Sequence, residues 1–292
     1  MTMTKARAIY ELVFAGLLWG FGFIATKWSL VCFSPALVLV LRYVFATGIG
    51  VLIHRFFQTP RPQSNPPKWT GILAGMFLAG FMITQTIGLQ YTTATNSGFL
   101  TCLYVVFVPV FHLLWKRKNI GLKRAMNVLM AVIGAFLLSG GNIHTINIGD
   151  VWTVGCAILS AFHILFIDHI AEDIGDPFQF NNLQSFWGLI FILPLAFAEK
   201  QSVLSVQTTD LAWAMAGVLF LALGSTLLAF LIQIRTQKIL EPTTASMLFL
   251  LEGIFALVFG VIFYSEVLRP VQFIGVALIL VGAALQVREA RT

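Results

Sequence analysis

Long apolar stretches separated by short polar links run along the whole chain. A helix needs about 20 apolar residues to cross the hydrocarbon core of a bilayer. Backbone amides in lipid must be hydrogen-bonded within the protein, and runs of this length without strict alternation favour helices over a closed barrel. The pattern therefore predicts ten transmembrane helices, at residues 8–28, 35–54, 69–89, 94–115, 121–139, 150–170, 178–198, 211–233, 242–264 and 270–288.

The composition supports this prediction and excludes a water-soluble fold. Hydrophobic residues make up 58% of the 292 positions, and charged residues only 10%. A soluble domain carries about 25% charged residues, because its surface must be solvated. The longest polar link runs only from Arg55 to Lys68, which leaves no room for a separate catalytic domain. Residues 8–28 exceed the length of a signal-peptide core, so we expect them to form the first retained helix.

The Lys and Arg residues in the links predict the orientation of the helices. Cytoplasmic links carry an excess of these residues. With a cytoplasmic N-terminus, the outer segments hold only Lys200 and Arg269, and Lys27 and Arg42 lie within spans. The other 14 of the 18 basic residues are then on the inside: Lys5, Arg7, Arg55, Arg61, Lys68, Lys116, Arg117, Lys118, Lys123, Arg124, Arg235, Lys238, Arg288 and Arg291. We therefore expect both termini to be cytoplasmic.

An internal similarity divides the chain into two halves. Residues 132–135, Val-Ile-Gly-Ala, resemble residues 280–283, Leu-Val-Gly-Ala, at an offset of 148. Five spans per half is an odd number, so the second half lies upside down relative to the first. Secondary transporters often use such inverted repeats and bind substrate near the midplane between them. We predict an all-α membrane protein with two inverted five-helix repeats, residues 1–145 and 146–292; two static fused halves are the alternative.

Several motifs resemble those of EamA-type domains. They are residues 18–27 (LWGFGFIATK), Ser34-Pro35 and residues 41–43 (LRY) in the first half, and residues 241–253, Ser265-Glu266 and residues 274–282 in the second. The chain is thus similar to EamA-type members of the drug/metabolite transporter superfamily over nearly its whole length. The resemblance implies ten helices in two inverted repeats that move small metabolites, often amino acids outward. Gly253, where the family usually has Pro, and His163, where it usually has an aromatic residue, depart from the pattern.

Catalytic, cofactor and metal motifs are missing from the sequence. There is no GxxxxGKS/T loop for ATP, no HExxH and no GxSxG. Cys32, Cys102 and Cys156 are far apart, which supports neither a disulfide framework nor a zinc site. The net charge of +6 comes from short inter-helix links, so we do not expect nucleic acid as a partner. We predict no enzyme activity and no cofactor; an intramembrane hydrolase is disfavoured because His163 and Asp168 point in different directions.

Ionisable residues within the spans are the first candidates for function. Such a group at mid-bilayer costs about 2.5–3.5 kcal/mol on insertion scales, so it needs an explanation. Glu252, midway along the ninth span, is predicted to contact substrate or couple proton movement, or else to brace helices as a neutral carboxyl. Arg42 is predicted to pair helices or gate, rather than contact substrate. Lys27 either reaches the interface or contacts substrate.

Polar and aromatic side chains deep in the spans are further candidates for a substrate cavity. Trp19, Phe23 and Lys27 share one face of the first span, because they are four residues apart. His163 is midway along the sixth span, where a satisfied core histidine is the alternative. The predicted substrate-binding residues are therefore Trp19, Phe23, Lys27, Gln85, Tyr104, His163, Trp187 and Glu252.

Taken together, these features predict a secondary transporter that works by alternating access. Its expected substrate is a small metabolite, an amino acid or related compound, exported across a bacterial inner membrane and driven by the substrate gradient, exchange or protons. Uptake is one alternative, and a non-transporting membrane scaffold or sensor is another. The expected partners are the lipid bilayer, the small-molecule substrate and protons.

Overall fold

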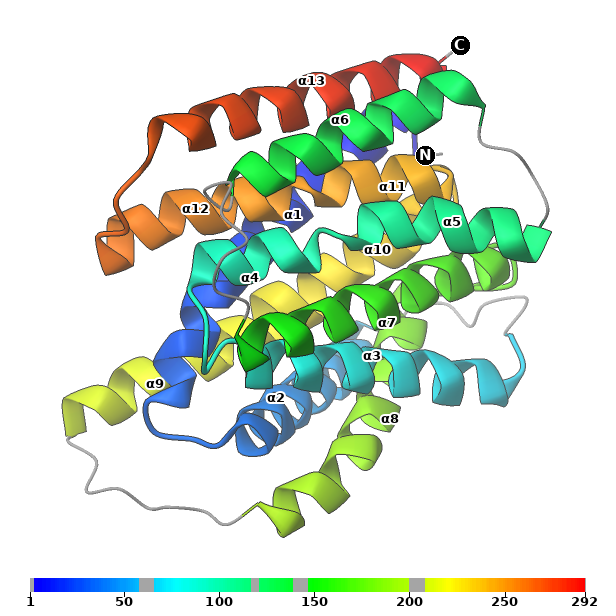
Figure 1. Cartoon of the computed structure of the whole chain (residues 1–292). Coiled ribbons are helices and arrows are strands. Elements are labelled where there is room, and N and C mark those ends of the chain that lie inside the picture. The colour runs from blue at the N-terminus through cyan, green and yellow to red at the C-terminus, as the bar shows by residue number, and fades with distance from the viewer. Residues whose placement is uncertain (1–2, 58–65, 117–120, 139–146, 200–207, 292) are drawn as a thin grey trace.

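The chain is a helical bundle (Figure 1). The computed structural model describes residues 3–57, 66–116, 121–138, 147–199 and 208–291, and these contain no strand. Six spans are single helices longer than 20 residues: α1 (Lys5–Leu30), α2 (Pro35–Phe57), α3 (Lys68–Gly88), α7 (Ile148–Ile170), α8 (Pro177–Ala198) and α13 (Pro270–Arg291). A seventh, α6 (Leu122–Leu138), has 17 described residues.

Three spans are interrupted near their middle. The fourth consists of α4 (Ala94–Thr101) and α5 (Tyr104–Lys116), and the ninth of α11 (Pro242–Phe249) and α12 (Leu251–Tyr264). The eighth joins α9 (Thr208–Phe220), the π-helix η1 (Leu221–Ala229) and α10 (Phe230–Thr236). In the described ranges, nine helical segments are long and apolar enough to cross a membrane, and α6 forms the tenth span. The predicted spans are confirmed, with edges that differ by a few residues.

Local sequence signals explain where several helices begin and end. The Asn147 side chain accepts a hydrogen bond from the Asp150 amide, and Asp150 returns one to the Asn147 amide, which forms a capping box at α7. Asp176 caps α8 just before Pro177, a residue suited to the first helical position. At the end of α12, Ser265 adopts a left-handed conformation with φ of 52° and stops the helix.

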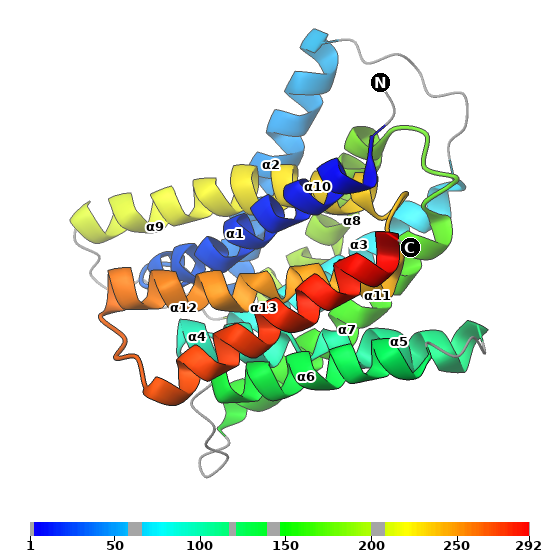
Figure 2. The ribbon, with the colours of Figure 1, turned by 90° about the horizontal axis from the view of Figure 1, so that it is seen from above.

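The two halves have the same order of elements and run in opposite directions. The helices α4 and α11 are both eight residues long, and they begin at Ala94 and Pro242. The helices α6 and α13 begin at Leu122 and Pro270, so both pairs are separated by the 148 residues seen in the sequence. Figures 1 and 2 show α6 and α13 lying side by side and antiparallel, with the start of α1 and the end of α13 at the same end of the bundle.

Helix contacts repeat the same relation. The third span packs on the sixth as the first packs on the eighth, and α2 packs on its counterpart α8. Likewise the fourth span packs on α7 as the ninth packs on α1. This is the expected fold, two inverted five-helix repeats related by a pseudo-two-fold axis. The predicted boundary between residues 145 and 146 lies outside the described residues.

Close backbone packing joins the repeats at the α6–α13 pair. A Cβ added to Gly134 would lie 2.8 Å from the Gly275 carbonyl oxygen, and one added to Gly275 would lie 2.5 Å from the Gly134 carbonyl oxygen. Small residues allow such approach, and in lipid this packing replaces the hydrophobic effect as the force between helices. The pair therefore requires glycine at both positions.

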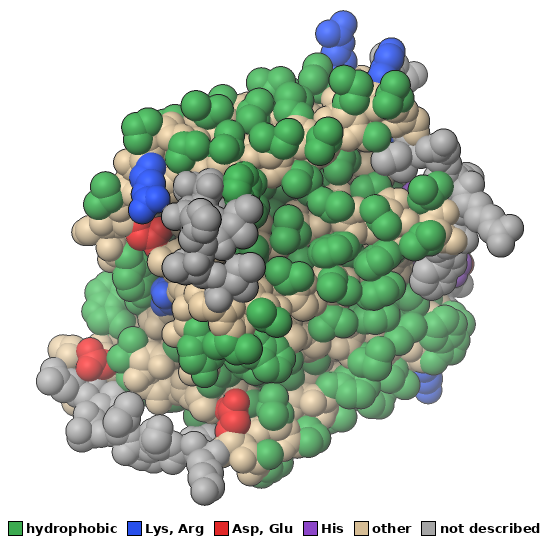
Figure 3. Space-filling view, viewed as in Figure 1, with side chains coloured by type: hydrophobic (Ala, Val, Ile, Leu, Met, Phe, Trp, Pro, Cys, Tyr) green, Lys and Arg blue, Asp and Glu red, His purple; other side chains and the backbone are tan. Residues whose placement is uncertain are grey.

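The outside of the bundle is apolar and its interior holds polar groups. Figure 3 shows a face covered mostly by hydrophobic side chains, with Lys, Arg, Asp and Glu mainly toward its margins. Large apolar side chains such as Leu114, Leu122 and Phe197 are exposed, whereas Arg42, Gln184 and Glu252 are buried. A surface of this kind suits lipid, and the buried polar groups mark where function is to be sought.

Candidate functional site

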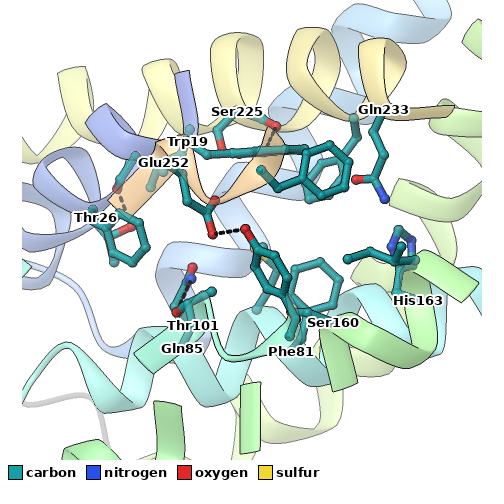
Figure 4. Close-up of a pocket in the computed structure, with 18 of the residues that line it drawn as sticks. Trp19, Thr26, Phe81, Gln85, Thr101, Ser160, His163, Ser225, Gln233 and Glu252 are labelled. Carbon is teal, nitrogen blue, oxygen red and sulfur yellow. Dashed lines mark hydrogen bonds between the residues drawn. The ribbon is translucent and has the colours of Figure 1, made fainter. Parts of the chain in front are cut away.

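A narrow cavity of about 50 Å³ lies where the two repeats meet (Figure 4). It has room for only a few water molecules in this conformation. The first repeat contributes Trp19, Gly22, Phe23, Thr26, Arg42, Phe81, Met82, Gln85, Thr101 and Tyr104 to its wall. The second contributes Ser160, His163, Ile164, Leu221, Ser225, Phe230, Gln233, Phe249 and Glu252.

The two broken helices bring a carboxyl group and a phenol together at the centre of the seam. Tyr104 is the first residue of α5, and Glu252 is the second of α12. The Tyr104 hydroxyl donates to Glu252 Oε1 at 3.0 Å, the contact that is dashed at Glu252 in Figure 4. Since the two residues are 148 positions apart, they hold equivalent places in the repeats. Glu252 is thus hydrogen-bonded to the residue that holds the equivalent position in the other repeat.

Tight turns produce both breaks. The Leu103 amide bonds the Leu100 carbonyl and the Gly253 amide bonds the Leu250 carbonyl, a spacing of three residues in place of four. A Cβ added to Gly253 would lie 3.2 Å from Cys102 Sγ, so the two turns are in contact. The Cys102 thiol also lies 3.8 Å from the Leu250 carbonyl oxygen. Gly253, a departure from the family pattern, allows this approach.

Arg42 is held against the π-helix of the eighth span. Its side chain is 3% exposed. Nε donates to Thr226 Oγ1 at 2.5 Å, and one terminal nitrogen, Nη2, donates to Ser225 Oγ at 2.9 Å. Single-turn π-bulges are frequent at functional sites, and this π segment turns two hydroxyls toward the arginine. The structure therefore joins α2 to η1 through Arg42, which keeps it a candidate for helix pairing or gating.

A chain of buried amides supports His163. Its Nε2 lies 3.1 Å from Gln184 Oε1, and Gln184 Nε2 donates to Asn181 Oδ1 at 2.9 Å. Asn181 Nδ2 then donates to the carbonyl oxygens of Thr226 and Leu227 in η1. With this orientation of the Gln184 amide, Nε2 carries the hydrogen. His163 is therefore a satisfied core histidine that also lines the cavity.

Aromatic rings form two similar corners of the cavity. The Trp19 ring lies 5.3 Å from the Phe230 ring, and the His163 ring lies 5.3 Å from the Phe81 ring. Trp19 also meets Phe249 edge-on at 5.2 Å, and its Nε1 donates to the Ser225 carbonyl oxygen at 3.3 Å. Rings packed in this manner favour an apolar or aromatic group in the cavity.

Seven of the nine predicted site residues line this cavity, and two lie elsewhere. The seven are Trp19, Phe23, Arg42, Gln85, Tyr104, His163 and Glu252. Gln85 Nε2 donates to Thr101 Oγ1 at 3.2 Å. Lys27 Nζ instead donates to the Thr92 carbonyl oxygen at 2.8 Å and lies 5.8 Å from the centre of the Tyr264 ring. Trp187 packs where α3 and α8 cross, beside Gly75. The contacts of Lys27 support the prediction that its side chain reaches toward the interface rather than to a substrate.

Sequence reasoning missed several cavity residues. Phe81, Ser160, Ser225 and Phe230 line the wall. The chain has 27 Phe residues, and neither a Phe nor an uncharged Ser stands out in an apolar span. Asn181, which links His163 to η1, was also missed. Asn181 follows the first residue of α8 by only four positions, where a polar residue is expected near the interface, and only the tertiary fold buries it against the eighth span.

Contacts between the repeats lie toward both ends of the cavity. At the end where α1 begins, Arg235 forms an ion pair with Glu11, which also pairs with Arg7 at 2.9 Å. At the opposite end, Thr95 donates to Glu266. Asn96 Nδ2 donates to Asp150 Oδ1 there at 2.7 Å. These contacts must change if either end is to open.

Relatives of the chain are found in bacteria, archaea and plants. An "Uncharacterized transporter" of Archaeoglobus fulgidus is 31% identical over 94% of this chain and 83% of its own length. The "Uncharacterized transporter YetK" of Bacillus subtilis is 26% identical over 71% of this chain and 63% of its own length. A "WAT1-related protein" of Arabidopsis thaliana is 27% identical over 45% of this chain and 42% of its own.

The fold is also that of a solved protein. A crystal structure matches with a TM-score of 0.78 over 99% of both chains, at 16% identity, which bears on the fold alone. The model of the EamA-like transporter family matches twice, at residues 7–140 and 147–288. Two matched segments that cover most of the chain, on an all-helical fold with a cavity at the seam, show that the chain belongs to the EamA-like transporter family.

Proposed function

We propose that the protein is a secondary transporter that exports an amino acid or related small metabolite across a bacterial inner membrane. Transport proceeds by alternating access between the two repeats, residues 1–145 and 146–292, and is coupled to protons at Glu252. The observation that carries this proposal is the position of Glu252. Its carboxyl group is buried at the seam, lines the cavity, and is bonded by Tyr104 of the other repeat.

The position of Glu252 supports coupling for a physical reason. A carboxyl group in a low-dielectric site is costly to ionise alone, so its charge depends on protons and on a bound ligand. Because its partner Tyr104 comes from the other repeat, a change in that hydrogen bond accompanies a change in how the repeats pack. A proton on Glu252 is therefore linked to the direction in which the cavity opens.

The remaining candidates fit the walls of a substrate site. Trp19, Phe23 and His163 supply ring faces and Gln85 supplies an amide, a mixture suited to a small molecule with apolar and polar parts. Lys27 and Trp187 are outside this wall, so we propose no direct substrate contact for them.

Both termini are proposed to be cytoplasmic. The bias of basic residues toward the segments on that side supports this orientation. Arg61, Arg117, Lys118 and Lys200, which contribute to the count, lie outside the described residues. Reporter fusions at the C-terminus and after residue 203 should report opposite sides of the membrane; the same side for both would contradict this topology.

Counterflow in proteoliposomes tests the function. The purified full-length chain is reconstituted into liposomes, and the liposomes are loaded with each of a panel of amino acids and common metabolites. Uptake of the labelled compound is then followed with and without a pH gradient. We expect exchange of at least one amino acid and a response to the gradient. Glu252→Gln should fold, bind substrate and lose the response.

A matched control separates a coupling role from a general loss of charge. Glu241 lies at the start of the same span, is exposed, and pairs with Arg124 at 2.5 Å. Glu241→Gln should keep the response to the gradient. The same pH profile in the wild-type protein and Glu252→Gln would remove Glu252 from coupling. Ligand binding without flux would favour a sensor, and net movement only inward in cells would favour uptake.

A further inference from the structure

Arg42 is a buried cation without an acidic partner. All twelve Asp and Glu residues of the chain lie within the described ranges. Among these described side chains none forms an ion pair with Arg42; Glu11, for example, pairs with Arg7 and Arg235. Glu252 lines the same cavity, but its hydrogen bond is with Tyr104. The hydrogen-bond partners of the charged Arg42 side chain are therefore neutral groups.

The neutral groups use only part of what the guanidinium offers. A guanidinium has five N–H donors in a planar fork. Nε and Nη2 donate to the hydroxyls of Thr226 and Ser225, both on one side in η1. Burying a charge without a counter-charge is expensive, so an arginine at such a position needs a reason beyond these two hydrogen bonds.

The second repeat shows that the fold itself does not need this charge. Arg42 follows the first residue of α2, Pro35, by seven positions, and Gln184 follows the first residue of α8, Pro177, by the same number. Gln184 is fully buried and neutral, and it bonds His163 and Asn181. The equivalent place in the second repeat is thus filled by a neutral amide.

The surroundings of Arg42 suit an amphipathic anion. Arg42 and Ser225 line the cavity together with the rings of Trp19, Phe230 and Phe249. A guanidinium fork matches the two oxygens of a carboxylate, with which it forms charge-assisted hydrogen bonds. The rings beside it provide an apolar surface for the rest of the ligand.

We propose that Arg42 binds the carboxylate of the transported substrate, and that the ring wall of Trp19, Phe230 and Phe249 holds the apolar part. This inference rests on the proposed transport function and names the substrate class: a carboxylate with an apolar or aromatic side group. The expected role of Arg42 in pairing α2 with η1 remains, since the same side chain makes both contacts.

Four probes with the same ring test this assignment. They are phenylalanine, phenylalaninamide, 3-phenylpropionate and phenethylamine, of which the first and third carry a carboxylate. Binding to the purified full-length chain is measured by thermal stabilisation, and exchange by competition against labelled phenylalanine in proteoliposomes. We expect the two carboxylates to bind about 10- to 100-fold more tightly than the amide and the amine, the range of a charge-assisted hydrogen bond.

Three variants separate recognition from folding. Arg42→Gln should lower the affinity for the two carboxylates to that for phenylalaninamide. The affinity for phenylalaninamide itself should not change. Arg42→Lys, which keeps the charge but loses the fork, should give an intermediate preference and remains informative if Arg42→Gln does not fold. Arg124→Gln, at the exposed start of α6, should behave as the wild type.

The outcomes distinguish this inference from the proposed function. Equal binding of carboxylates and phenylalaninamide, an unchanged preference in Arg42→Gln, or no binding of any probe to the wild-type chain would overturn the role of Arg42. Carboxylate binding that depends on Arg42 without any exchange would uphold it and overturn transport. Exchange of phenylalanine with no carboxylate preference would uphold transport and overturn the inference.

Discussion

The two repeats carry different side chains at equivalent places around the cavity. Tyr104 of the first repeat stands opposite Glu252 of the second, and Arg42 corresponds to Gln184. The Trp19 ring packs on Phe230, and the His163 ring makes the corresponding contact with Phe81. Elsewhere the halves match: α4 and α11 have equal lengths, and α6 and α13 begin 148 residues apart.

This contrast distinguishes the helices that are proposed to move from the side chains that are proposed to bind the substrate. An inverted pair of repeats can exchange conformations because their helix contacts are alike, which is the basis of alternating access. A substrate, however, has no such symmetry, so the groups that bind it differ between the halves. The frame is therefore symmetric, and the proposed chemistry lies where the side chains break that symmetry.

The largest effect is expected from breaking the frame. Gly275→Leu places a side chain where even a Cβ would lie 2.5 Å from the Gly134 carbonyl oxygen. Overpacking costs about 1–3 kcal/mol where side chains can adjust, and here the neighbour is backbone. We expect little folded protein, measured as the monodisperse fraction in detergent. Gly48→Ala is the control, since nothing lies within 4 Å of its Cβ. A well-folded Gly275→Leu protein would contradict the tight α6–α13 crossing.

A smaller effect is expected from removing the hydrogen bond between the interrupted fourth and ninth spans. Tyr104→Phe deletes the hydroxyl that donates to Glu252 but keeps the ring. A neutral hydrogen bond contributes about 1 kcal/mol, which corresponds to roughly a fivefold change. We expect exchange to fall by about that factor, with folding retained, as measured in proteoliposomes. Tyr10→Phe, at an exposed position on α1, serves as the control. An unchanged rate would mean that this hydrogen bond is not used during transport.

Removing a ring from one of the two aromatic corners should alter the preference among substrates rather than the rate of exchange. His163→Ala removes the ring that packs on Phe81 and the partner of Gln184. We expect the preference between large and small substrates to shift by about threefold to tenfold, since a modest change in pocket volume contributes roughly 1 kcal/mol or more. Competition by phenylalanine and alanine for the same exchange measures it. His169→Ala, near the end of the same helix, is the comparison; equal preferences would count against a substrate contact at His163.

The smallest effect is expected at Lys27, outside the cavity. Its ammonium group bonds the Thr92 carbonyl oxygen near the end of the bundle. Lys27→Met keeps the apolar stem and removes the charge. Because this half-buried group is not among the residues that line the cavity, we expect a change in exchange of less than about twofold and no change in preference. A substrate preference altered by this substitution would place Lys27 back in the substrate path.

Most of the fold followed from local patterns. The ten spans, their approximate edges and the division into inverted halves were predicted because hydropathy is read within about 20 residues. The breaks at Cys102 and Leu250 and the π-helix at Leu221–Ala229 were not predicted, since these stretches are as apolar as uninterrupted helices. Of the site residues, Glu252 and Arg42 were identified by the cost of charge in lipid, while Asn181 and Ser225 carried no such signal.

The sequence by itself determined that the chain crosses the membrane, that it does so an odd number of times per repeat, and that a few ionisable groups are buried. Only the tertiary structure decided which of those groups meet. It joined Glu252 to Tyr104, left Arg42 without an acidic partner, and placed Lys27 outside the cavity. The physical reason is that hydropathy depends on neighbours in the chain, whereas the direction of a buried side chain depends on how each helix is rotated and crossed by helices far away in sequence.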